Sequence, residues 1–414
     1  MPSPLVMKFG GTSVADVERI RRVAELVESE ARTGRPLAVV VSAMAGYTNQ
    51  FVAWTDLAGN AGGKADDEYD AVVSSGEAIT AGLLAIALRA RGLNARSWQG
   101  WQIPIRTDSS HGRARIVDLP GDRLLKSMKD GAIAVIAGFQ GVAEDGRITT
   151  RGRGGSDTSA VAVAAAVKGA CDIYTDVDGV YTTDPRIEPR ARKLDRLSYE
   201  EMLEFASLGA KVLQTRSVEL AMAHKVPVRV LSSFTEPGRS GPGVGTLICE
   251  EDQGVEHRIV SGVASSRDEA KITLLGLPDR VGVPAEVFAR LAAANLNVDM
   301  IVQSSARAEG AVNMEFTVGR RDSDRALQVM RDARAAIGFQ DVRADNDVAK
   351  VSVVGVGMRS HAGVADTMFR ALAERGIRIQ AISTSEIKIS VLIEAAYMEL
   401  AVRALHAAYG LEAV

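Results

Sequence analysis

The sequence predicts an α/β protein: a mainly parallel sheet with helices on both faces, followed by two smaller, mutually related βαββαβ modules. Two observations lead to this prediction. Over the first 245 residues, short apolar runs alternate with helical stretches, as they do in the strand–helix–strand units that build parallel sheets. After residue 245, a βαββα pattern occurs twice with matching residues, and an internal repeat of this kind indicates duplicated modules.

Composition excludes several classes of protein. The chain has 414 residues, 46% of them hydrophobic, so each of roughly two to three domains can bury a full core. The net charge is −3 with both signs interspersed, whereas nucleic-acid and membrane-surface partners require a basic field. Two cysteines, Cys171 and Cys249, are too few for a disulfide framework and fit a reducing compartment. Because no apolar signal core or membrane-length apolar run is found, we expect a cytoplasmic protein.

Hydrophobic periodicity assigns strands and helices in the first region. Strands are expected at Leu5–Phe9, Leu37–Val41, Ala132–Phe139, Asp172–Thr175 and Pro227–Ser233. Helices are expected at residues 17–27, Ala78–Arg91 and Thr158–Val167. The capping-box spacing of Ser198 and Glu201 predicts a further helix start. Because residues 236–245 are rich in Pro and Gly, we place the end of a first domain, 1–245, there.

The second region follows a different pattern. Its first copy is expected as strand Lys271–Leu277, helix Pro284–Ala294, strands Val298–Ser304 and Val312–Val318, and helix Arg325–Ile337. Its second copy is expected as strand Lys350–Val356, helix Val364–Arg375, strands Arg378–Ser383 and Lys388–Glu394, and helix Met398–Tyr409. Each copy needs one more strand to complete a ferredoxin-like βαββαβ sandwich. We therefore predict two modules, at 263–340 and 346–414.

The two copies also match residue by residue. Gly276 and Arg280 recur 79 residues later as Gly355 and Arg359. From Gly282 onward the interval is 81, through the pairs Gly282/Gly363, Phe288/Phe369, Leu291/Leu372, Ile301/Ile382 and Ser304/Ser385. A consistent interval supports a duplication more strongly than any single motif does.

Two segments near helix starts indicate an anion site. KFGGTS (8–13) follows a strand and precedes a helix. Its adjacent glycines let backbone N–H groups approach an anion, the helix N-terminus adds positive potential, and Lys8 adds a full charge. SSGE (74–77) enters a helix, where Glu77 could be only a first-turn carboxylate. Taken alone, KFGGTS is also compatible with an ordinary strand–turn–helix and a surface lysine.

Two further segments lie in the middle of the chain. TTRGRGGSDTSA (149–160) sets arginines among glycines before a helix. The glycines give a ligand carboxylate room to reach the guanidinium of Arg153, while Asp157 could be a plain N-cap. TDVDGVYTTDPR (175–186) follows a short strand, outside the strand carboxyl ends where α/β sheets bind ligands. Its DxDG spacing resembles a calcium loop, but it has no acidic residue at the twelfth position, so a calcium site is rejected.

Together and in this order, the four segments resemble those of the aspartate kinases, members of the amino-acid kinase family. The resemblance covers the whole chain, because the paired C-terminal modules are similar to ACT domains. Its most specific segments are KFGGTS, GRGGSDTSA and TDVDGVYTTDPR, supported by GAKVLQTRS at 209–217. The chain departs from the family pattern at Gln214-Thr215, where His-Pro is usual, and at Arg151, where an apolar residue is usual. Arg151 adds a positive charge beside the substrate loop.

The resemblance implies an amino-acid kinase fold and a role for each matching residue. The ATP-binding residues would be Lys8, Phe9, Gly10, Gly11, Ser42, Thr175, Asp176, Tyr181, Asp184, Arg186 and Lys211. The residues that hold aspartate would be Thr48, Glu77, Arg153 and Ser156. Glu77 would bind the substrate ammonium and Arg153 its α-carboxylate. The catalytic set would be Lys8, Asp157 and Lys211, with Asp157 orienting the lysines.

The implied reaction is ATP-dependent phosphorylation of the β-carboxylate of L-aspartate to 4-phospho-L-aspartate, the first step toward lysine, threonine and methionine. This carboxylate needs no general base, because its reference pKa of about 3.9 leaves it ionised at pH 7. The difficulty is repulsion between two anions, which lysines and the Mg²⁺ brought with ATP would offset during in-line transfer. No Cys or His is placed as a covalent nucleophile, and no protein metal site is predicted.

Two alternatives remain open. The acceptor could be glutamate or acetylglutamate, although the tandem sensing modules and GRGGSDTSA argue against this. The chain could also be an inactive kinase that only senses amino acids. The intact site residues argue against that alternative, namely Lys8, Glu77, Arg153, Asp157 and Lys211.

The resemblance also implies regulation by lysine, by threonine or by both. The effector-binding residues would be Asp279, Asn297, Val298, Asp299 and Gln303 of the first module. The second module has Met358, Arg378 and Gln380 at the corresponding positions, so the first should supply most effector contacts. Because modules that bind an effector across an interface must pair, we expect a homodimer or a higher oligomer through the ACT modules.

Overall fold

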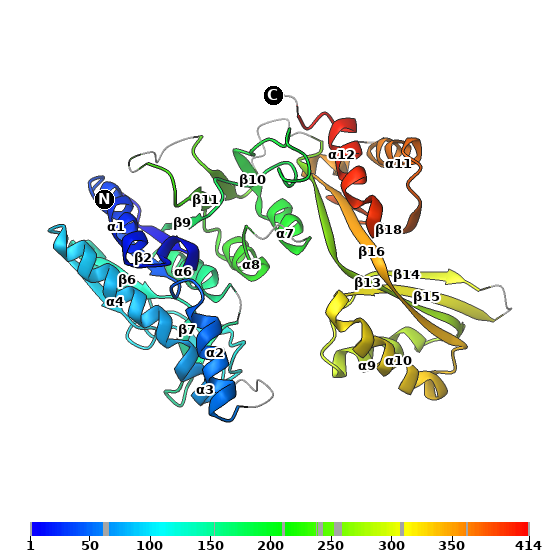
Figure 1. The fold of residues 1–414 in the computed structure, drawn as a ribbon, viewed down its shortest axis with the longest axis horizontal. Coiled ribbons are helices and arrows are strands. Elements are labelled where there is room, and N and C mark those ends of the chain that lie inside the picture. Colours follow the sequence, from blue (N-terminus) through cyan, green and yellow to red (C-terminus); the bar gives the residue numbers. More distant parts are fainter. Residues whose placement is uncertain are drawn as a thin grey trace. The chain divides into compact units, whose positions relative to one another are not determined.

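The computed structural model describes residues 2–60, 66–152, 154–208, 212–236, 238, 243–251, 259–306, 310–361 and 363–412. The chain divides into two compact units (Figure 1). The N-terminal unit comprises Met1–Val180, Lys193–Ala206 and Lys211–Gly254. The C-terminal unit comprises Tyr181–Arg192, Ser207–Ala210 and Val255–Val414.

The N-terminal unit is built on an eight-stranded sheet with the order β10-β12-β11-β9-β1-β2-β6-β3. Its strands are β1 (Leu5–Phe9), β2 (Leu37–Val41), β3 (Ala95–Trp98), β6 (Ile133–Ala137), β9 (Ala170–Thr175), β10 (Arg196–Ser198), β11 (Val228–Ser232) and β12 (Thr246–Cys249). All neighbours run parallel except β11 and β12. The expected mainly parallel sheet is therefore confirmed, and all five strands predicted in this region are present.

The sheet separates two helical layers, because successive side chains of a strand point to opposite faces. Leu5, Met7 and Phe9 of β1 belong to a core that also includes residues of α1 and α4. Lys8, between them, reaches α6 instead, where it pairs with Asp157. Figure 1 shows α1 and α4 side by side. The helices of this unit are α1 (Val17–Ala31), α2 (Tyr47–Ala58), α3 (Asp67–Val73), α4 (Ser75–Ala90), α5 (Asp122–Lys129), α6 (Gly155–Ala166), α7 (Tyr199–Ser207) and α8 (Thr215–His224), with a 3₁₀ turn at Gly11–Val14.

The continuous helical stretch of α3 and α4 combines a long apolar sequence with buried charges. By length and composition alone, Asp67–Ala90 could cross a membrane. Half of its most apolar window is buried inside the protein, and Leu84 and Leu88 belong to the core. It also carries Asp70 and Glu77, both buried. A core helix of a folded domain accounts for these features.

A second sheet of four short strands, in the order β5-β4-β7-β8, was not predicted from the sequence. Its strands are β4 (Arg106–Thr107), β5 (Ile116–Asp118), β7 (Gln140–Val142) and β8 (Ile148–Thr150). Strands of two or three residues are too short to produce a readable alternation. This sheet matters for the site because β8 ends at Thr150, directly before the arginine- and glycine-rich segment.

The predicted capping box at the start of α7 is confirmed. The backbone N–H of Ser198 donates to Glu201 Oε2 at 3.0 Å, and the backbone N–H of Glu201 donates to Ser198 Oγ at 3.1 Å. The reciprocal pair satisfies two of the backbone donors that a helix start leaves free.

The C-terminal unit contains a six-stranded antiparallel sheet with the order β14-β15-β13-β16-β18-β17. Its strands are β13 (Gly262–Pro278), β14 (Asp299–Ser305), β15 (Ala311–Val318), β16 (Asp341–Val354), β17 (Ile379–Thr384) and β18 (Lys388–Glu394). Its helices are α9 (Val283–Ala293), α10 (Ser323–Ile337), α11 (Val364–Glu374) and α12 (Met398–Ala408), with 3₁₀ turns at Arg320–Asp322, Val356–Ser360 and Ala395–Tyr397. Strands β13 and β16 are the long central pair in Figure 1.

These long strands supply the strand that each copy lacked. Leu274 of β13 pairs with Val342 in the first part of β16, which closes the first module. Gly262 at the start of β13 pairs with Val354 at the end of β16, which closes the second. Each module therefore has the ferredoxin-like arrangement, and each long strand serves both. Both strands begin earlier than the sequence predicts, at Gly262 and Asp341, because polar residues interrupt their early halves.

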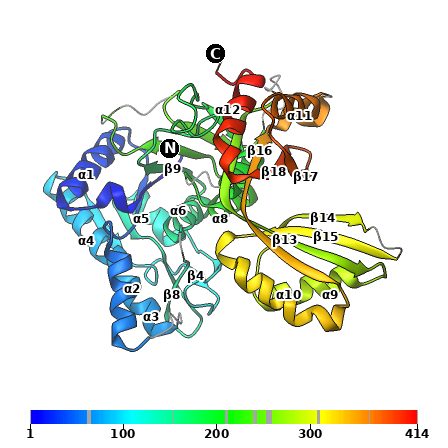
Figure 2. The same cartoon turned by 45° about the vertical axis from the view of Figure 1, so that its right-hand side comes forward.

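The two modules have separate cores. Helices α9 and α10 cover the first, where Phe316 and Leu291 are buried, and α11 and α12 cover the second, where Val351 and Leu405 are buried. In Figure 2, α9 and α10 lie along one face of the sheet formed by β13, β14 and β15. The duplication seen in the sequence is thus a duplication of packed modules.

Candidate functional site

Three adjacent parallel strands end at the same level in the N-terminal unit. Phe9 at the end of β1 is paired with Val41 of β2 on one side and with Tyr174 of β9 on the other. The next residues, Gly10, Ser42 and Thr175, therefore meet at the carboxyl edge of the sheet. Open α/β sheets bind ligands at this edge.

A buried ion pair lies directly beside this edge. Lys8 Nζ is 2.5 Å from Asp157 Oδ1, and both residues are 8% exposed. The interpretation of Lys8 as a surface lysine is therefore wrong. Asp157 is not a plain N-cap either, because the N-cap of α6 is Gly154, which has no side-chain cap. The pair places one positive and one negative charge at a helix start, where the backbone adds positive potential.

The two adjacent glycines that follow Phe9 lie in close surroundings. A Cβ on Gly10 would lie 3.3 Å from Lys8 Nζ, and a Cβ on Gly11 would lie 3.1 Å from the Ala43 carbonyl oxygen. Within the described residues, the buried hydroxyl of Ser13, in the 3₁₀ turn that follows, has no hydrogen-bond partner. The segment thus offers a close backbone, an ammonium and an unused hydroxyl to an anion.

Glu77 is a buried carboxylate in the first turn of α4. A Cβ on Gly76 would lie 2.6 Å from Ala43 Cβ, so the glycine allows α4 to begin directly against the end of β2. Glu77 is 4% exposed, and its Oε2 has no hydrogen-bond partner in the described part of the chain. Burial raises the pKa of Glu77 to about 7, although hydrogen bonds from backbone N–H groups and the charge of Arg151 act in the opposite direction.

Arg151 is a buried arginine whose charge acts on Glu77, and it was expected only as an extra charge near the loop. It is 2% exposed, and none of its guanidinium nitrogens has a hydrogen-bond partner among the described residues. Burial, and then the nearby charge of Arg216, lower the pKa of Arg151 to about 9, while Glu77 raises it. Arg216 donates to the carbonyl oxygens of Arg151 (3.3 Å) and Ala114 (3.2 Å).

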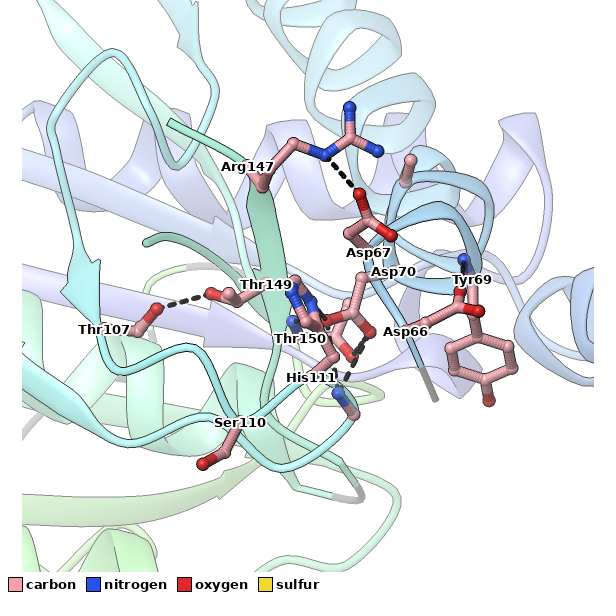
Figure 3. A network of polar contacts seen from close by, with 12 residues as sticks. Asp66, Asp67, Tyr69, Asp70, Thr107, Ser110, His111, Arg147, Thr149 and Thr150 are labelled. Carbon is pink, nitrogen blue, oxygen red and sulfur yellow. Dashed lines mark hydrogen bonds and ion pairs between the residues drawn. The ribbon is translucent and has the colours of Figure 1, made fainter. Parts of the chain in front are cut away.

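A network centred on Asp70 holds the strand that leads to Arg151 (Figure 3). Asp70 is fully buried and accepts hydrogen bonds from the backbone N–H groups of Gly112 (3.1 Å) and Thr150 (2.8 Å). It also accepts from the Thr150 hydroxyl at 2.5 Å and contacts His111 Nδ1 at 2.8 Å. This network was not predicted from the sequence. Its signal was the spacing of Asp70 and Glu77, which lie seven residues apart on one helical face.

Two of the residues expected to hold aspartate, Thr48 and Ser156, lie at helix starts. Thr48 is half-buried in the first turn of α2. Ser156 is buried in the first turn of α6, and its Oγ would lie 2.8 Å from a Cβ on Gly138. At the end of β9 the Thr175 hydroxyl donates to Asp176 Oδ1 at 3.0 Å. Two further expected residues, Arg153 and Lys211, lie outside the described residues.

Three expected ATP-binding residues, Tyr181, Asp184 and Arg186, belong to the C-terminal unit. Arg186 is paired with Asp184 at 2.7 Å, and this partner lowers the pKa of the Asp184 carboxyl despite partial burial. Their segment is anchored by Thr182, whose Oγ1 accepts from the Arg192 backbone N–H (2.9 Å) and contacts His406 Nε2 of α12 (2.9 Å). The segment Tyr181–Arg192 is therefore hydrogen-bonded to the second module.

The expected effector residues lie at exposed positions of the first module. Asp279, Asn297 and Gln303 are exposed and Val298 is half-buried. Asp299 is already paired, because Lys350 Nζ lies 2.7 Å from its Oδ2. Burial raises the pKa of Asp299, but the hydrogen bond and charge of Lys350 outweigh burial and leave it below its usual value.

Lys350 is held by a second carboxylate as well. Its Nζ lies 2.8 Å from Glu269 Oε1, and Lys350 and Glu269 are both buried. Searched over the described residues, no group of three His, Cys, Asp or Glu side chains is arranged to hold a metal ion. Lys350 therefore joins two carboxylates, Glu269 and Asp299, in one cluster of ion pairs.

Known protein families match the N-terminal unit and the two C-terminal modules. The model of the amino acid kinase family matches residues 3–232, and an ACT domain model matches residues 272–333 and 351–409. An aspartate kinase of Pseudomonas putida is 52% identical over 412 residues, covering 99% of this chain and 98% of the relative.

Two solved structures of E. coli aspartokinase III are also similar. The complex with aspartate and ADP (R-state) has a TM-score of 0.79 and 28% identity, covering 98% of this chain and 99% of that chain. The complex with lysine and aspartate (T-state) has a TM-score of 0.76 and 28% identity, covering 97% and 98%. The chain therefore belongs to the amino acid kinase family, among the aspartokinases that carry C-terminal ACT domains.

Proposed function

We propose that this chain phosphorylates the side-chain carboxylate of L-aspartate with ATP, giving 4-phospho-L-aspartate. The observation that carries the proposal is the buried Lys8–Asp157 pair at the carboxyl edge of the sheet, beside Gly10 and Gly11. It lies in a chain that is similar over its whole length to proteins named aspartate kinases, one of them solved with aspartate and ADP.

Phosphoryl transfer needs charge stabilisation more than covalent chemistry. The acceptor carboxylate is ionised at pH 7, so no base is required. Lys8 supplies a positive charge to the transferring group, and Asp157 holds that ammonium in place. The ATP-binding residues are proposed to be Lys8, Phe9, Gly10, Gly11, Ser42, Thr175, Asp176, Tyr181, Asp184, Arg186 and Lys211. The catalytic set is proposed to be Lys8, Asp157 and Lys211.

Mg²⁺ is proposed to arrive with the ATP phosphates. This ion prefers oxygen ligands and takes only one or two protein carboxylates when it binds with a nucleotide. Asp176, exposed at the end of β9, fits that requirement. When bound, the ion neutralises phosphate charge.

The acceptor is proposed to be held by Thr48, Glu77, Arg153 and Ser156. Glu77 binds the substrate ammonium through its free Oε2. Ser156 and Thr48 lie in the first turns of helices whose backbone N–H groups can donate hydrogen bonds to a carboxylate. Because the product is an acyl phosphate, these groups must also keep water away until it leaves.

The experiment that tests this function is an ADP-release assay with aspartate, glutamate and N-acetylglutamate, each with and without ATP. When ATP is present, aspartate should be the only one of the three acceptors that gives rapid ADP release. Faster release with glutamate or N-acetylglutamate would assign another acceptor, and no release with any of them would leave the chain as an amino-acid sensor. The matched control is Asp157→Asn, which keeps the size of the side chain and removes its charge. It should lower turnover with every acceptor.

Regulation by lysine, by threonine or by both is proposed for the C-terminal unit, with the reaction serving the synthesis of lysine, threonine and methionine. The similar E. coli enzyme has been solved with lysine. The effector residues are proposed to be Asp279, Asn297, Val298, Asp299 and Gln303. Inhibition assays on Gln303→Ala test this assignment: uninhibited turnover should persist while sensitivity to the effector falls.

The assembly is proposed to be a homodimer or a higher oligomer formed through the ACT modules. Ile301 of β14 and Ile382 of β17 support this proposal, because they are exposed apolar residues at corresponding repeat positions on the two edge strands. The domain division is proposed to be 1–245, 263–340 and 346–414. A cytoplasmic location is proposed as well, and it is compatible with Cys171 and Cys249 not being joined in a disulfide.

A further inference from the structure

Arg151 is a buried cation that the proposed chemistry does not yet use. Its side chain is 2% exposed, and within the described part of the chain its three guanidinium nitrogens meet no hydrogen-bond acceptor. A buried charge without a partner is strongly unfavourable, and removing it by an apolar substitution would be the simplest remedy. A ligand carboxylate would supply the partner that this guanidinium lacks among the described residues.

Glu77 is the matching half of such a site. It is 4% exposed, and its Oε2 is also without a partner among the described residues. The two side chains interact electrostatically, since the charge of Arg151 lowers the pKa of Glu77. They form no direct ion pair in the described structure, so each keeps free bonding atoms.

Hydrogen bonds hold the backbone on both sides of Arg151. The preceding N–H, of Thr150, donates to Asp70 at 2.8 Å, and the Arg151 carbonyl accepts from Arg216 at 3.3 Å. Arg216 brings a second positive charge close to Arg151. The two neighbouring guanidinium charges favour an anionic ligand, and a backbone held in place by hydrogen bonds favours binding.

We propose that Arg151 binds the α-carboxylate of the acceptor amino acid while Glu77 binds its ammonium. The inference rests on the proposed function and names the specificity-determining group of that site. An α-amino acid carries its ammonium and carboxylate on one carbon, so it fits between a free carboxylate and a free guanidinium. One carboxylate has about four lone-pair sites, so Arg151 can share it with Arg153, the residue to which the sequence alone assigned it. The side-chain carboxylate is left free to attack the phosphate.

The test is Arg151→Met, assayed with L-aspartate and with its α-amide, which replaces the α-carboxylate by a neutral group of similar size. The KM for aspartate should rise at least about 30-fold, with the KM for ATP nearly unchanged. The preference for aspartate over the α-amide should fall by a similar factor. Arg151→Lys, which keeps the charge but loses the planar fork, should lie between wild type and Arg151→Met.

Arg147→Met is the matched control. Arg147 lies four residues earlier and is 40% exposed, paired with Asp67 and Glu68 at the surface. Surface pairs contribute little, so this variant should keep wild-type kinetics. Differential scanning fluorimetry adds a second measurement. Without ligand, Arg151→Met should melt at or above the melting temperature of wild type, because the substitution removes a buried charge. Aspartate should raise the melting temperature of wild type but not that of Arg151→Met.

Three results separate the possible errors. If wild type phosphorylates aspartate and Arg151→Met keeps its KM and its preference over the α-amide, the inference is wrong and the proposed function stands. If wild type shows no aspartate-dependent ADP release, the proposed function is wrong. In that case the melting temperatures test the inference. Aspartate should raise the melting temperature of wild type and not that of Arg151→Met. An equal increase in both proteins, or no increase in either, overturns the inference.

Discussion

Changing the pH tests the site most directly, because Glu77 titrates within the working range of an enzyme. Burial raises the pKa of Glu77 to about 7 from an ordinary value of 4.5. Between these two values the folded state holds a proton that the unfolded state releases. The contribution of Glu77 to stability is therefore fully present below pH 4.5 and is lost as the pH rises through 7. At 1.36 kcal/mol per pKa unit, the loss amounts to about 3 kcal/mol.

If Glu77 binds the substrate ammonium as proposed, the same titration should also control substrate binding. Below pH 7 the protonated Glu77 has no charge with which to attract an ammonium, so kcat/KM for aspartate should fall about tenfold for each pH unit. The assay is ADP release from pH 5.5 to 8.5 at saturating ATP, with aspartate varied. Glu77→Gln should bind aspartate weakly at every pH. It should also be more stable than wild type at pH 8 and not at pH 4, as measured by urea unfolding.

Glu77→Gln controls for every other titrating group, including those of the substrates, because it changes only this carboxyl. If Glu77→Gln and wild type have parallel pH profiles for kcat/KM, Glu77 does not bind the ammonium. If their stabilities differ by the same amount at pH 4 and pH 8, the raised pKa itself is wrong. The two measurements therefore test the role and its physical cause separately.

Three further predictions concern buried charges. Lys8→Ala should lower kcat at least about a hundredfold, measured by ADP release. It should also destabilise the fold by about 3 kcal/mol in urea unfolding because Asp157 stays buried and unpaired; a near-normal kcat refutes the phosphate role. Asp70→Asn should cost about 3 kcal/mol in the same unfolding assay, since it removes a charged acceptor of several hydrogen bonds; an unchanged stability refutes the structural role. Lys350→Met should leave Glu269 buried and unpaired and also cost about 3 kcal/mol, and calorimetric titration with lysine should give a changed affinity; no change in either quantity refutes the pairing.

Strongly periodic elements could be predicted from the sequence because local pattern and tertiary packing agree in them. Leu5–Phe9 and Leu37–Val41 are fully buried parallel strands, and the observed bounds equal the expected ones. The second module gave equally good agreement, since its strand at Lys388–Glu394 has the predicted limits. In each case apolar side chains meet helices on a buried face, so the hydrophobic pattern carries the information.

The missed features depend on contacts between distant segments. The early half of β13 reads as polar because Arg267 and Asp268 interrupt it, and only its pairing with β16 makes it a strand. Asp70 looks like an ordinary charge near a helix start until Thr150, eighty positions later, donates to it. Arg151 departs from a family pattern, but its burial could not be read from the chain. Local sequence patterns do not show which residues distant in the chain come into contact in the fold.

The duplication also produced a difference that bears on regulation. Lys271 and Lys350 occupy corresponding positions, and each reaches the second strand of the other module. Lys350 forms an ion pair with Asp299 there. Lys271 instead donates a hydrogen bond of 2.6 Å to the uncharged amide of Gln380. An effector ammonium that binds Asp299 must compete with Lys350, and this competition would loosen a contact between the modules. Effector binding at the first module would thus weaken a contact between the two modules. Allosteric regulation requires such a coupling between ligand binding and a structural change elsewhere.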